Sequence, residues 1–367
     1  MAGTETPRAT GAPRTTVTGR VTVADAAGRR GRWRPALLVT LVAALFLTLC
    51  LLSLGLGALR IPPGQVLDVL TGQPVGARVE DVIMSVRVPR TGLAVAAGAA
   101  LGLSGAVMQA LTHNPLADPG ILGVSAGAAF AIVVAAGPLG LSGVNGHVWF
   151  AFAGAMAASV LVHQLGRLGR SGPTPVKLAL AGITITSVLT SLTSAVVLTD
   201  PDALDRYRFW SAGSLAGTDA ATVVRILPFL AVGAVLALFI APALNSLALG
   251  DDVAVSLGRR LGPLRLQGVV AVTLLTGGAV AVIGPVVFIG LVVPHTARAL
   301  AQWAGVGPDH RWLLPLSAVL AASLLLAADI LGRLLASPAE VQAGVIVAFI
   351  GGPFFVALVR RRRLAEV

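Results

Sequence analysis

The sequence predicts an all-α, polytopic membrane protein of about ten transmembrane helices. Two observations favour this fold class. Hydrophobic residues make up 56% of the 367 residues, charged residues only 12%, and the mean hydropathy is +0.87. A soluble domain carries about 25% charged residues, so this chain lacks the charge to cover a water-facing exterior. The apolar residues also form long runs that are interrupted at charged positions, as helices crossing a hydrocarbon core of about 30 Å require.

Each predicted span is an apolar run bounded by charged or turn residues. The long Leu, Ala, Val and Gly runs argue against an outer-membrane β-barrel, in which short strands of alternating polarity follow one another. Between the seventh and eighth spans, Gly284 and Pro285 interrupt one long apolar stretch. The predicted spans are 36–59, 91–111, 117–137, 148–166, 178–198, 222–242, 266–284, 286–303, 313–331 and 343–359.

The chain is predicted to consist of one membrane domain between two basic ends. Residues 1–35 are rich in Thr, Arg, Gly and Ala, and they lack the large apolar side chains that a folded domain needs, so we expect a disordered cytoplasmic tail. Residues 36–360 form the transmembrane domain, and residues 361–367 form a basic cytoplasmic C-terminus. The first apolar run is longer than the roughly 7–15 residues of a signal-peptide core, so we expect it to be a span.

The distribution of basic residues predicts the orientation. Most of the 27 lysines and arginines fall on one side of the membrane if the N-terminus is cytoplasmic, and the hairpin at 138–147 on the other side has none. Cytoplasmic loops carry an excess of Lys and Arg, so both termini are predicted to be cytoplasmic. The net charge of +11 is therefore explained by membrane orientation, and we expect no nucleic-acid partner.

Several kinds of chemistry are excluded. Cys50 is the only cysteine, so neither an internal disulfide nor a cysteine-based metal cluster can form. Lys177 is the only lysine and is followed by Leu178, so the chain has no Walker A motif and no phosphate cradle of that kind. The five histidines are spread over both sides of the membrane. We expect no cofactor, no bound metal and no catalytic residue.

A series of short motifs extends along the chain. They are Arg87-Val-Pro-Arg90, Asn114-Pro-Leu-Ala-Asp-Pro-Gly120 continuing to Gly127, Phe209-Trp-Ser-Ala-Gly-Ser-Leu215, Leu249 to Gly258, Gly284 to His295 with Arg298, Asp309-His-Arg311, Ala328 to Arg333 and Gly351-Gly-Pro-Phe354. In this order and spacing they resemble the FecCD family, the permease subunits of bacterial ABC importers for iron–siderophores, haem and vitamin B12. The resemblance covers about residues 36 to 360.

This resemblance implies a half-transporter in the bacterial plasma membrane. Two such permeases, identical or homologous, would form a central pathway through the lipid bilayer. An extracytoplasmic solute-binding protein would deliver the metal chelate, and two separate ATPase subunits would supply the energy. A ferric siderophore is the preferred substrate, and haem or vitamin B12 is the alternative.

The resemblance also implies a docking site for the binding protein at Arg87, Arg90 and Arg333, which fall on the outer side by the charge pattern. A guanidinium group is suited to bidentate capture of a carboxylate. In the family, arginines at matching positions pair with glutamates of the binding protein. Alternatively, these arginines anchor helix ends at the level of the lipid headgroups.

The longest predicted cytoplasmic loop contains a coupling segment at about 246–262. Val253, Ala254 and Leu257 have near-helical spacing with charged residues around them, a pattern that fits a short helix in the groove of a partner protein. An interfacial helix on the lipid headgroups is the alternative. The residues that match the family's ATPase-coupling segment are Leu249, Gly250, Asp252, Ala254, Leu257 and Gly258.

A cytoplasmic turn at 114–116 joins the second and third spans. The proline forces a helix end there, and the resemblance implies a cytoplasmic gate at Asn114 and Leu116, with an ordinary helix stop as the alternative. His295, Arg298 and Asp329 are ionisable residues within spans. We expect them to form structural hydrogen bonds or ion pairs rather than substrate contacts.

Small residues predict where helices approach closely. Gly98, Gly102 and Gly105 in the second span, and Gly123 and Gly127 in the third, follow small-xxx-small spacing. Two of the segments also contain Gly-x-Ser patterns, which suggest an intramembrane serine protease with His295 as the base. Such matches arise by chance in a chain rich in Gly, Ser and Ala. An ion-driven secondary transporter is the other alternative, but the spans lack paired carboxylates.

Overall fold

The computed structural model describes residues 33–57, 59–140, 144–168, 174–217, 219–337 and 339–363. All the regular secondary structure within these ranges is helical, so the all-α prediction is confirmed. Each predicted span holds one helix. These helices are α2 (Trp33–Gly55), α5 (Val88–Thr112), α6 (Val124–Ala136), α7 (Val144–Gly166), α8 (Pro175–Thr199), α10 (Ala220–Phe239), α13 (Leu261–Ile283), α14 (Ile289–Ala304), α15 (His310–Leu335) and α16 (Ala343–Arg363).

Two of these helices are too short to cross the membrane alone. Among the described residues, seven helices are long and apolar enough to span a bilayer, and α6, α14 and α16 are not among them. At 1.5 Å per residue, the 13 residues of α6 and the 16 of α14 reach only about 20–24 Å. Each follows a non-α segment, η2 (Pro119–Leu122) before α6 and residues 284–288 before α14. Irregular backbone at membrane depth is tolerated where protein surrounds it.

The second span differs most from its predicted bounds. A continuous helix extends from Ala77 to Thr112, built from α4 (Ala77–Asp81), the π-helical turn η1 (Val82–Arg87) and α5. Its 36 residues correspond to about 54 Å, well beyond the hydrocarbon thickness. The outer part of this helix therefore projects from the membrane. Because charged residues at 78–81 and 87–90 interrupt the apolar run, the sequence did not predict this outer extension of the helix.

Three short helices were not predicted as separate elements. They are α3 (Pro63–Leu70), α9 (Pro201–Ser211) and α11 (Ala241–Leu247). A fourth, α12 (Asp251–Ser256), lies in the coupling segment, where a short helix was predicted. The third span also begins later than predicted, because Asp118 caps the 3-10 turn η2 and Gly123 adopts a left-handed conformation with φ 72° before α6 starts.

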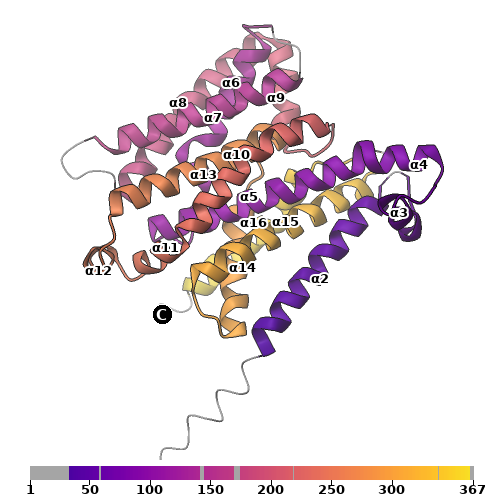
Figure 1. Ribbon diagram of the computed structural model, residues 1–367. Helices are drawn as coiled ribbons and strands as arrows, with labels where there is room; N and C mark the ends of the chain where they lie inside the picture. The colour runs from indigo at the N-terminus through magenta and orange to yellow at the C-terminus, as the bar shows by residue number, and fades with distance from the viewer. Residues whose placement is uncertain are drawn as a thin grey trace, which may run out of the picture.

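Helix α5 lies at the centre of the bundle, against α10, α13, α14 and α15 (Figure 1). Its glycines allow this close packing. A Cβ atom at Gly102 would lie 2.4 Å from the carbonyl oxygen of Ser317 on α15, and one at Gly105 would lie 2.1 Å from that of Gly290 on α14. Gly127 of α6 faces Gly154 of α7 in the same way. The prediction that these glycines mark close helix contacts is confirmed for Gly98, Gly102, Gly105 and Gly127, whereas Gly123 lies in the turn before α6.

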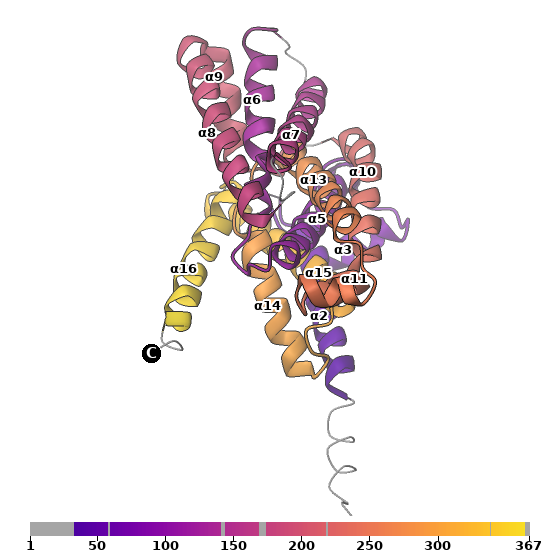
Figure 2. The ribbon, with the colours of Figure 1, turned by 90° about the vertical axis from the view of Figure 1, so that its left-hand side faces the viewer.

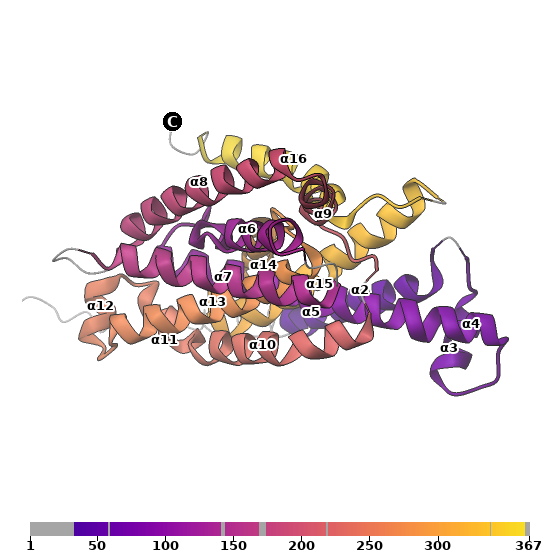
Figure 3. The same ribbon diagram turned by 90° about the horizontal axis from the view of Figure 1, so that it is seen from above.

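The bundle has two polar ends. Figure 3 shows α11 and α12 at one end, and α3 and α4 at the opposite end. The end with α11 and α12 is the cytoplasmic end by the charge pattern. Figure 2 shows α8 and α16 on the same side of the molecule. Side chains such as Leu192 and Leu198 of α8 and Phe349 of α16 are exposed there, and we call this side the open flank. Candidate functional residues gather at both polar ends and on this flank.

Candidate functional site

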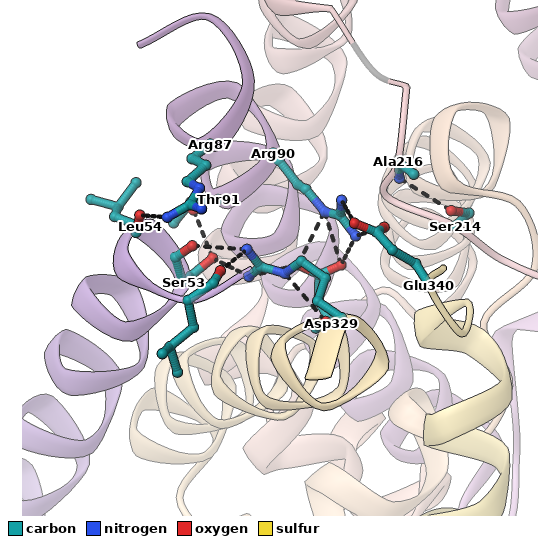
Figure 4. A network of polar contacts seen from close by, with 11 residues as sticks. Ser53, Leu54, Arg87, Arg90, Thr91, Ser214, Ala216, Asp329 and Glu340 are labelled. Atoms are coloured by element: carbon teal, nitrogen blue, oxygen red, sulfur yellow. Dashed lines mark hydrogen bonds and ion pairs between the residues drawn. The ribbon is translucent and has the colours of Figure 1, made fainter. Parts of the chain in front are cut away.

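The three arginines predicted to dock a binding protein lie together at the outer end. Figure 4 labels Arg87 and Arg90, and Arg333 joins them through its bonds to Asp329 and Ser53. Arg90 and Arg333 share the carboxylate of Asp329, with Nη2 of Arg90 2.7 Å from Oδ1 and Nη2 of Arg333 3.1 Å from Oδ2. Arg90 also pairs with Glu340, at 2.8 Å between Nη2 and Oε2. Asp329 is buried, whereas Glu340 has 38% of its side chain exposed. Asp329 thus forms structural ion pairs, as predicted.

Two of the arginines cap a helix from within the protein. Arg87 donates to the carbonyl oxygens of Leu54, at 2.5 Å, and Leu59. Arg333 donates to the carbonyl oxygens of Ser53, at 3.0 Å, and Leu56, at 2.7 Å. These carbonyls belong to the C-terminal end of α2 and the residues just after it, where unpaired acceptors and the negative end of the helix dipole favour cations.

The arginine cluster is largely buried, and Glu340 is its exposed member. Arg87 and Arg333 are each only 5% exposed, and the hydroxyl of Ser53 bonds both Arg333 and Thr91. Three guanidinium groups face two carboxylates, so the cluster keeps an excess positive charge. Arg90 is the arginine whose partner, Glu340, remains exposed. The docking role of these residues stays a prediction, and the described geometry also gives two of them a structural role.

The predicted gate turn is tied to two other segments at the cytoplasmic end. His113 ends α5 in a left-handed conformation with φ 50°, and its Nε2 lies 2.8 Å from the carbonyl oxygen of Leu247 in α11. The side chain of Asn114 accepts a hydrogen bond from the backbone N–H of Leu116, at 2.9 Å. His295 of α14 contacts the carbonyl oxygen of Pro115 at 2.9 Å. This turn therefore bridges α14 and the start of the coupling segment.

A second polar contact lies just above this turn. Gln109 is buried in α5 and donates to the carbonyl oxygen of Gly290, at 3.2 Å, near the start of α14. Arg298 of the same helix donates to the side-chain oxygen of Gln109. The prediction that His295 and Arg298 make structural hydrogen bonds is confirmed. Together these bonds fix α14 to α5 and to the gate turn.

The coupling segment exposes apolar side chains to water. Ala254 is fully buried against the bundle, but Leu249 is 64% and Leu257 59% exposed, and Val253 and Val255 are exposed as well. Charged residues surround these side chains in the sequence, as predicted. We call these four exposed residues the coupling patch. An apolar patch with a polar rim outside the membrane is typical of a protein interaction site.

Two polar contacts hold this segment in place. Arg265 at the start of α13 pairs with Asp251, at 2.6 Å. Asn245 of α11 donates to the carboxylate of Asp309, at 2.6 Å, and accepts from the backbone N–H of His310, at 2.8 Å. Asp309 caps α15, and the backbone N–H of Arg311 and the amide of Asn245 keep the pKa of its carboxyl below the usual range. The coupling segment is thereby joined to α13 and α15.

The open flank carries a row of hydroxyl groups. Thr184, Ser187, Ser191 and Ser194 are exposed and recur at three- and four-residue steps along one face of α8. Thr184, Ser191 and Ser194 donate their protons to carbonyl oxygens four residues earlier, at 2.9–3.0 Å. Such hydroxyls offer only acceptor lone pairs to a passing solute. The face is therefore polar and uncharged, and three of its four hydroxyl protons are already donated to the backbone.

A cavity of about 660 Å³ opens at the outer end of this flank. It lies between α6, α7, α9 and α13, and its walls mix aromatic and charged side chains. Among the described residues, no group of histidine, cysteine and acidic side chains could hold a metal ion. The residues that line the cavity include His147, Asp202, Asp205, Arg206, Phe209 and Trp210.

Comparison with known proteins identifies the family. The model of the FecCD transport family matches residues 45–361. The chain belongs to the FecCD transport family. It is 46% identical to the ferric enterobactin transport system permease protein FepD of Escherichia coli, over 89% of this chain and 95% of that protein. It is 36% identical to the hemin transport system permease protein HmuU of Yersinia pestis, over 91% of this chain and 98% of that protein.

The fold is shared with a solved transporter. The structure of a metal-chelate type ABC transporter in an inward-facing conformation matches 89% of this chain and 99% of that chain, with a TM-score of 0.77 and 28% identity. This FecCD protein is therefore a transport permease subunit rather than an enzyme, and a multi-pass protein of the inner membrane. The predicted family, fold class and localisation are confirmed.

Some residues of these sites were missed by sequence reasoning. Glu340 and Ser53 complete the arginine cluster, His113 ties the gate turn to α11, and Asn245 holds the coupling segment to α15. Glu340 is an acidic residue directly before the last predicted span, on the same side of the membrane as the three arginines. It could therefore have been proposed as an ion-pair partner for one of them. The partners of His113 and Asn245 are backbone atoms or residues far along the chain, for which the sequence gives no signal.

Proposed function

We propose that this chain is the permease subunit of an ABC importer for a ferric siderophore, powered by two separate ATPase subunits. The observation that carries this proposal is the coupling patch, an exposed apolar surface at the cytoplasmic end of a protein that has no Walker A motif of its own. A polar-rimmed apolar patch on a membrane protein outside its lipid-facing belt favours a protein partner. The ATPase subunits are that partner.

The substrate class rests on the relatives and on the open flank. FepD, which is 46% identical to this chain, is named for ferric enterobactin transport. The hydroxyl face of α8 carries no charge, and three of its four hydroxyls already donate to the backbone, so it offers little that would hold a polar ligand tightly. A bulky chelate moves past such a surface without strong binding, which leaves selection to the solute-binding protein. Haem remains the second candidate, because HmuU is named for hemin transport.

The pathway would lie between the open flanks of two permeases, identical or homologous. In one chain, large apolar side chains of α8 such as Leu192 and Leu198, and Phe349 of α16, remain exposed beside the hydroxyl face. A second copy on this flank covers the apolar residues and turns the hydroxyl row toward a central channel. Cysteines introduced at Ser191 and Ser194 are expected to react with water-soluble thiol reagents in the assembled importer, and a cysteine at the lipid-facing Val235 is not.

The cytoplasmic gate would be formed by Asn114 and Leu116 at the end of this pathway. The bond between His113 and the carbonyl oxygen of Leu247 links the gate turn to α11, directly before the coupling patch. A displacement of the coupling segment by the ATPase subunits would therefore pull on the gate turn. Packed helices switch by steps of about 1–2 Å, which suffices for a seal made of two side chains from each copy.

The outer cluster would receive the binding protein through Arg90. Its exposed partner Glu340 can be replaced by a glutamate of the binding protein, whereas Arg87 and Arg333 keep their bonds to α2. Arg90→Glu is expected to weaken association with the loaded binding protein by about 10-fold or more. If the Arg90→Glu variant binds as tightly as the wild type, the cluster serves only to hold α2.

The coupling patch supplies the experiment that tests the proposed function. Leu249→Ser and Leu257→Ser should reduce co-purification of the ATPase subunits and ligand-stimulated ATP hydrolysis, because both side chains would be buried at the interface. Leu67→Ser is the matched control, since Leu67 is an exposed leucine of α3 at the opposite end. The proposal is wrong if both patch variants retain the ATPase subunits as the wild type does, or if the isolated chain hydrolyses ATP.

A further inference from the structure

An apolar groove lies between α2 and α15, away from the open flank, the coupling patch and the gate turn. Its volume is about 260 Å³. The floor is a small buried cluster that includes Leu38 and Val42 of α2 and Ala304 of α14. The residues that line the groove are Leu38, Val39, Val42, Ala43, Phe46, Val306, Trp312, Pro315, Leu316 and Val319.

The groove lies in the cytoplasmic leaflet. It is formed by the first turns of α2 and α15 and by the loop between α14 and α15, all of which are at the cytoplasmic end by the charge pattern. Trp33, Trp303 and Trp312 are exposed near these helix ends. Tryptophan side chains favour the membrane–water interface. The groove therefore begins at headgroup level and continues into the hydrocarbon layer.

Basic residues lie at the mouth of the groove. Arg34 is exposed, lies one turn before Leu38 on α2 and packs over the ring of Trp33, at 5.9 Å. Arg311 is exposed next to Trp312 on α15. In the sequence, Arg29, Arg30 and Arg32 directly precede α2. The nearby acidic residue, Asp309, is already engaged by the backbone of α15 and by an amide.

We propose that this groove binds one acyl chain of an anionic phospholipid of the cytoplasmic leaflet, with the phosphate and headgroup held by Arg34 and Arg311. Arginine clusters directly cytoplasmic of a transmembrane helix attract anionic lipids, and basic pockets between helices on this side bind their headgroups. The shape of the groove orients the acyl chain. The selectivity comes from the headgroup, because the chain exchanges one apolar environment for another.

This site is independent of the transported substrate. It joins α2, which has few other neighbours on this side, to α14 and α15. The bound lipid would therefore hold the N-terminal helix to the body of the permease. Delipidation is expected to lower the thermal stability of the protein, and phosphatidylglycerol is expected to restore it.

The test is titration of the delipidated full-length protein with phosphatidylglycerol or phosphatidylcholine, followed by native mass spectrometry. The protein should bind one phosphatidylglycerol in preference to phosphatidylcholine. Each basic residue near the surface contributes a factor of about five, so Arg34→Gln with Arg311→Gln should weaken phosphatidylglycerol binding about 25-fold. Arg60→Gln with Arg78→Gln, two exposed arginines at the outer end, is the charge control and should bind as the wild type does.

A second pair of variants tests the groove itself. Ala43→Phe fills the groove, whereas Ala44→Phe adds the same side chain to the exposed neighbouring position of α2, which does not line it. Ala43→Phe alone should reduce binding of phosphatidylglycerol. Equal binding of both lipids by the wild type, or unchanged binding by the double arginine variant, would overturn the proposal. Equal effects of the two phenylalanine variants would show that the groove holds no chain.

Discussion

The central carboxylate of the outer cluster is the best place to perturb this permease. Asp329 is 2% exposed and faces both Arg90 and Arg333. In Asp329→Asn, two largely buried guanidinium groups lose their shared carboxylate, and Glu340 alone is left to balance the cluster. Breaking a buried ion pair by removing one partner costs about 3–5 kcal/mol, because the remaining charge is left uncompensated. We expect a destabilisation in this range.

Glu340→Gln is the matched control. This carboxylate also pairs with Arg90, but 38% of its side chain is exposed, and pairs of this kind contribute about 0–1 kcal/mol. Thermal unfolding of both variants in one detergent should therefore show a much larger fall of the midpoint for Asp329→Asn. Equal midpoints for the two variants would refute the reasoning, because they would mean that burial of the cluster does not determine its energy.

Three further predictions concern packing, pH and the gate. Gly105→Ala places a methyl group 2.1 Å from a carbonyl oxygen of α14 and should cost about 3 kcal/mol or more, whereas Gly92→Ala on the same helix meets open space and should be neutral or stabilising in thermal unfolding. The backbone N–H of Arg311 lowers the pKa of the Asp309 carboxyl, so the ionised carboxylate stabilises the fold at neutral pH and this stabilisation is lost as the pH falls below about 4. In Asp309→Asn, the unfolding midpoint should therefore depend less on pH in this range. Leu116→Cys, without the native cysteine, should crosslink two permeases at rest and less so with trapped nucleotide.

The sequence predicted the fold class, the family and the location of every long helix. Apolar runs in a membrane protein have few alternatives to a helix, because the bilayer leaves backbone groups no other partners. Charged residues limited this method. Arg87 and Arg90 lie inside a helix that continues outward to Ala77, although charged residues are typical of the end of a span. Their partners, the carbonyl oxygen of Leu54 for Arg87 and the carboxylate of Asp329 for Arg90, are far away in the sequence.

The sequence predicted which residues belong to the candidate sites, but not which of them are buried or which partners they contact. The apolar residues of the coupling segment were recognised from their spacing, and their exposure follows from a helix too short to bury more than Ala254. The arginines that are predicted to dock the binding protein would have to lie at the surface, yet Arg87 and Arg333 are buried under the end of α2. Their burial depends on where α2 ends relative to α5 and α15, and this packing is set by long-range contacts that local patterns do not encode.

The central claim is that this permease imports a ferric siderophore with the energy of ATP. It is tested by reconstituting the chain in liposomes with its ATPase subunits and its binding protein, loaded with a radiolabelled ferric siderophore. The account predicts that the label accumulates inside only when ATP, the ATPase subunits and the binding protein are all present. Accumulation driven by a proton or sodium gradient, in liposomes without the ATPase subunits, would contradict it.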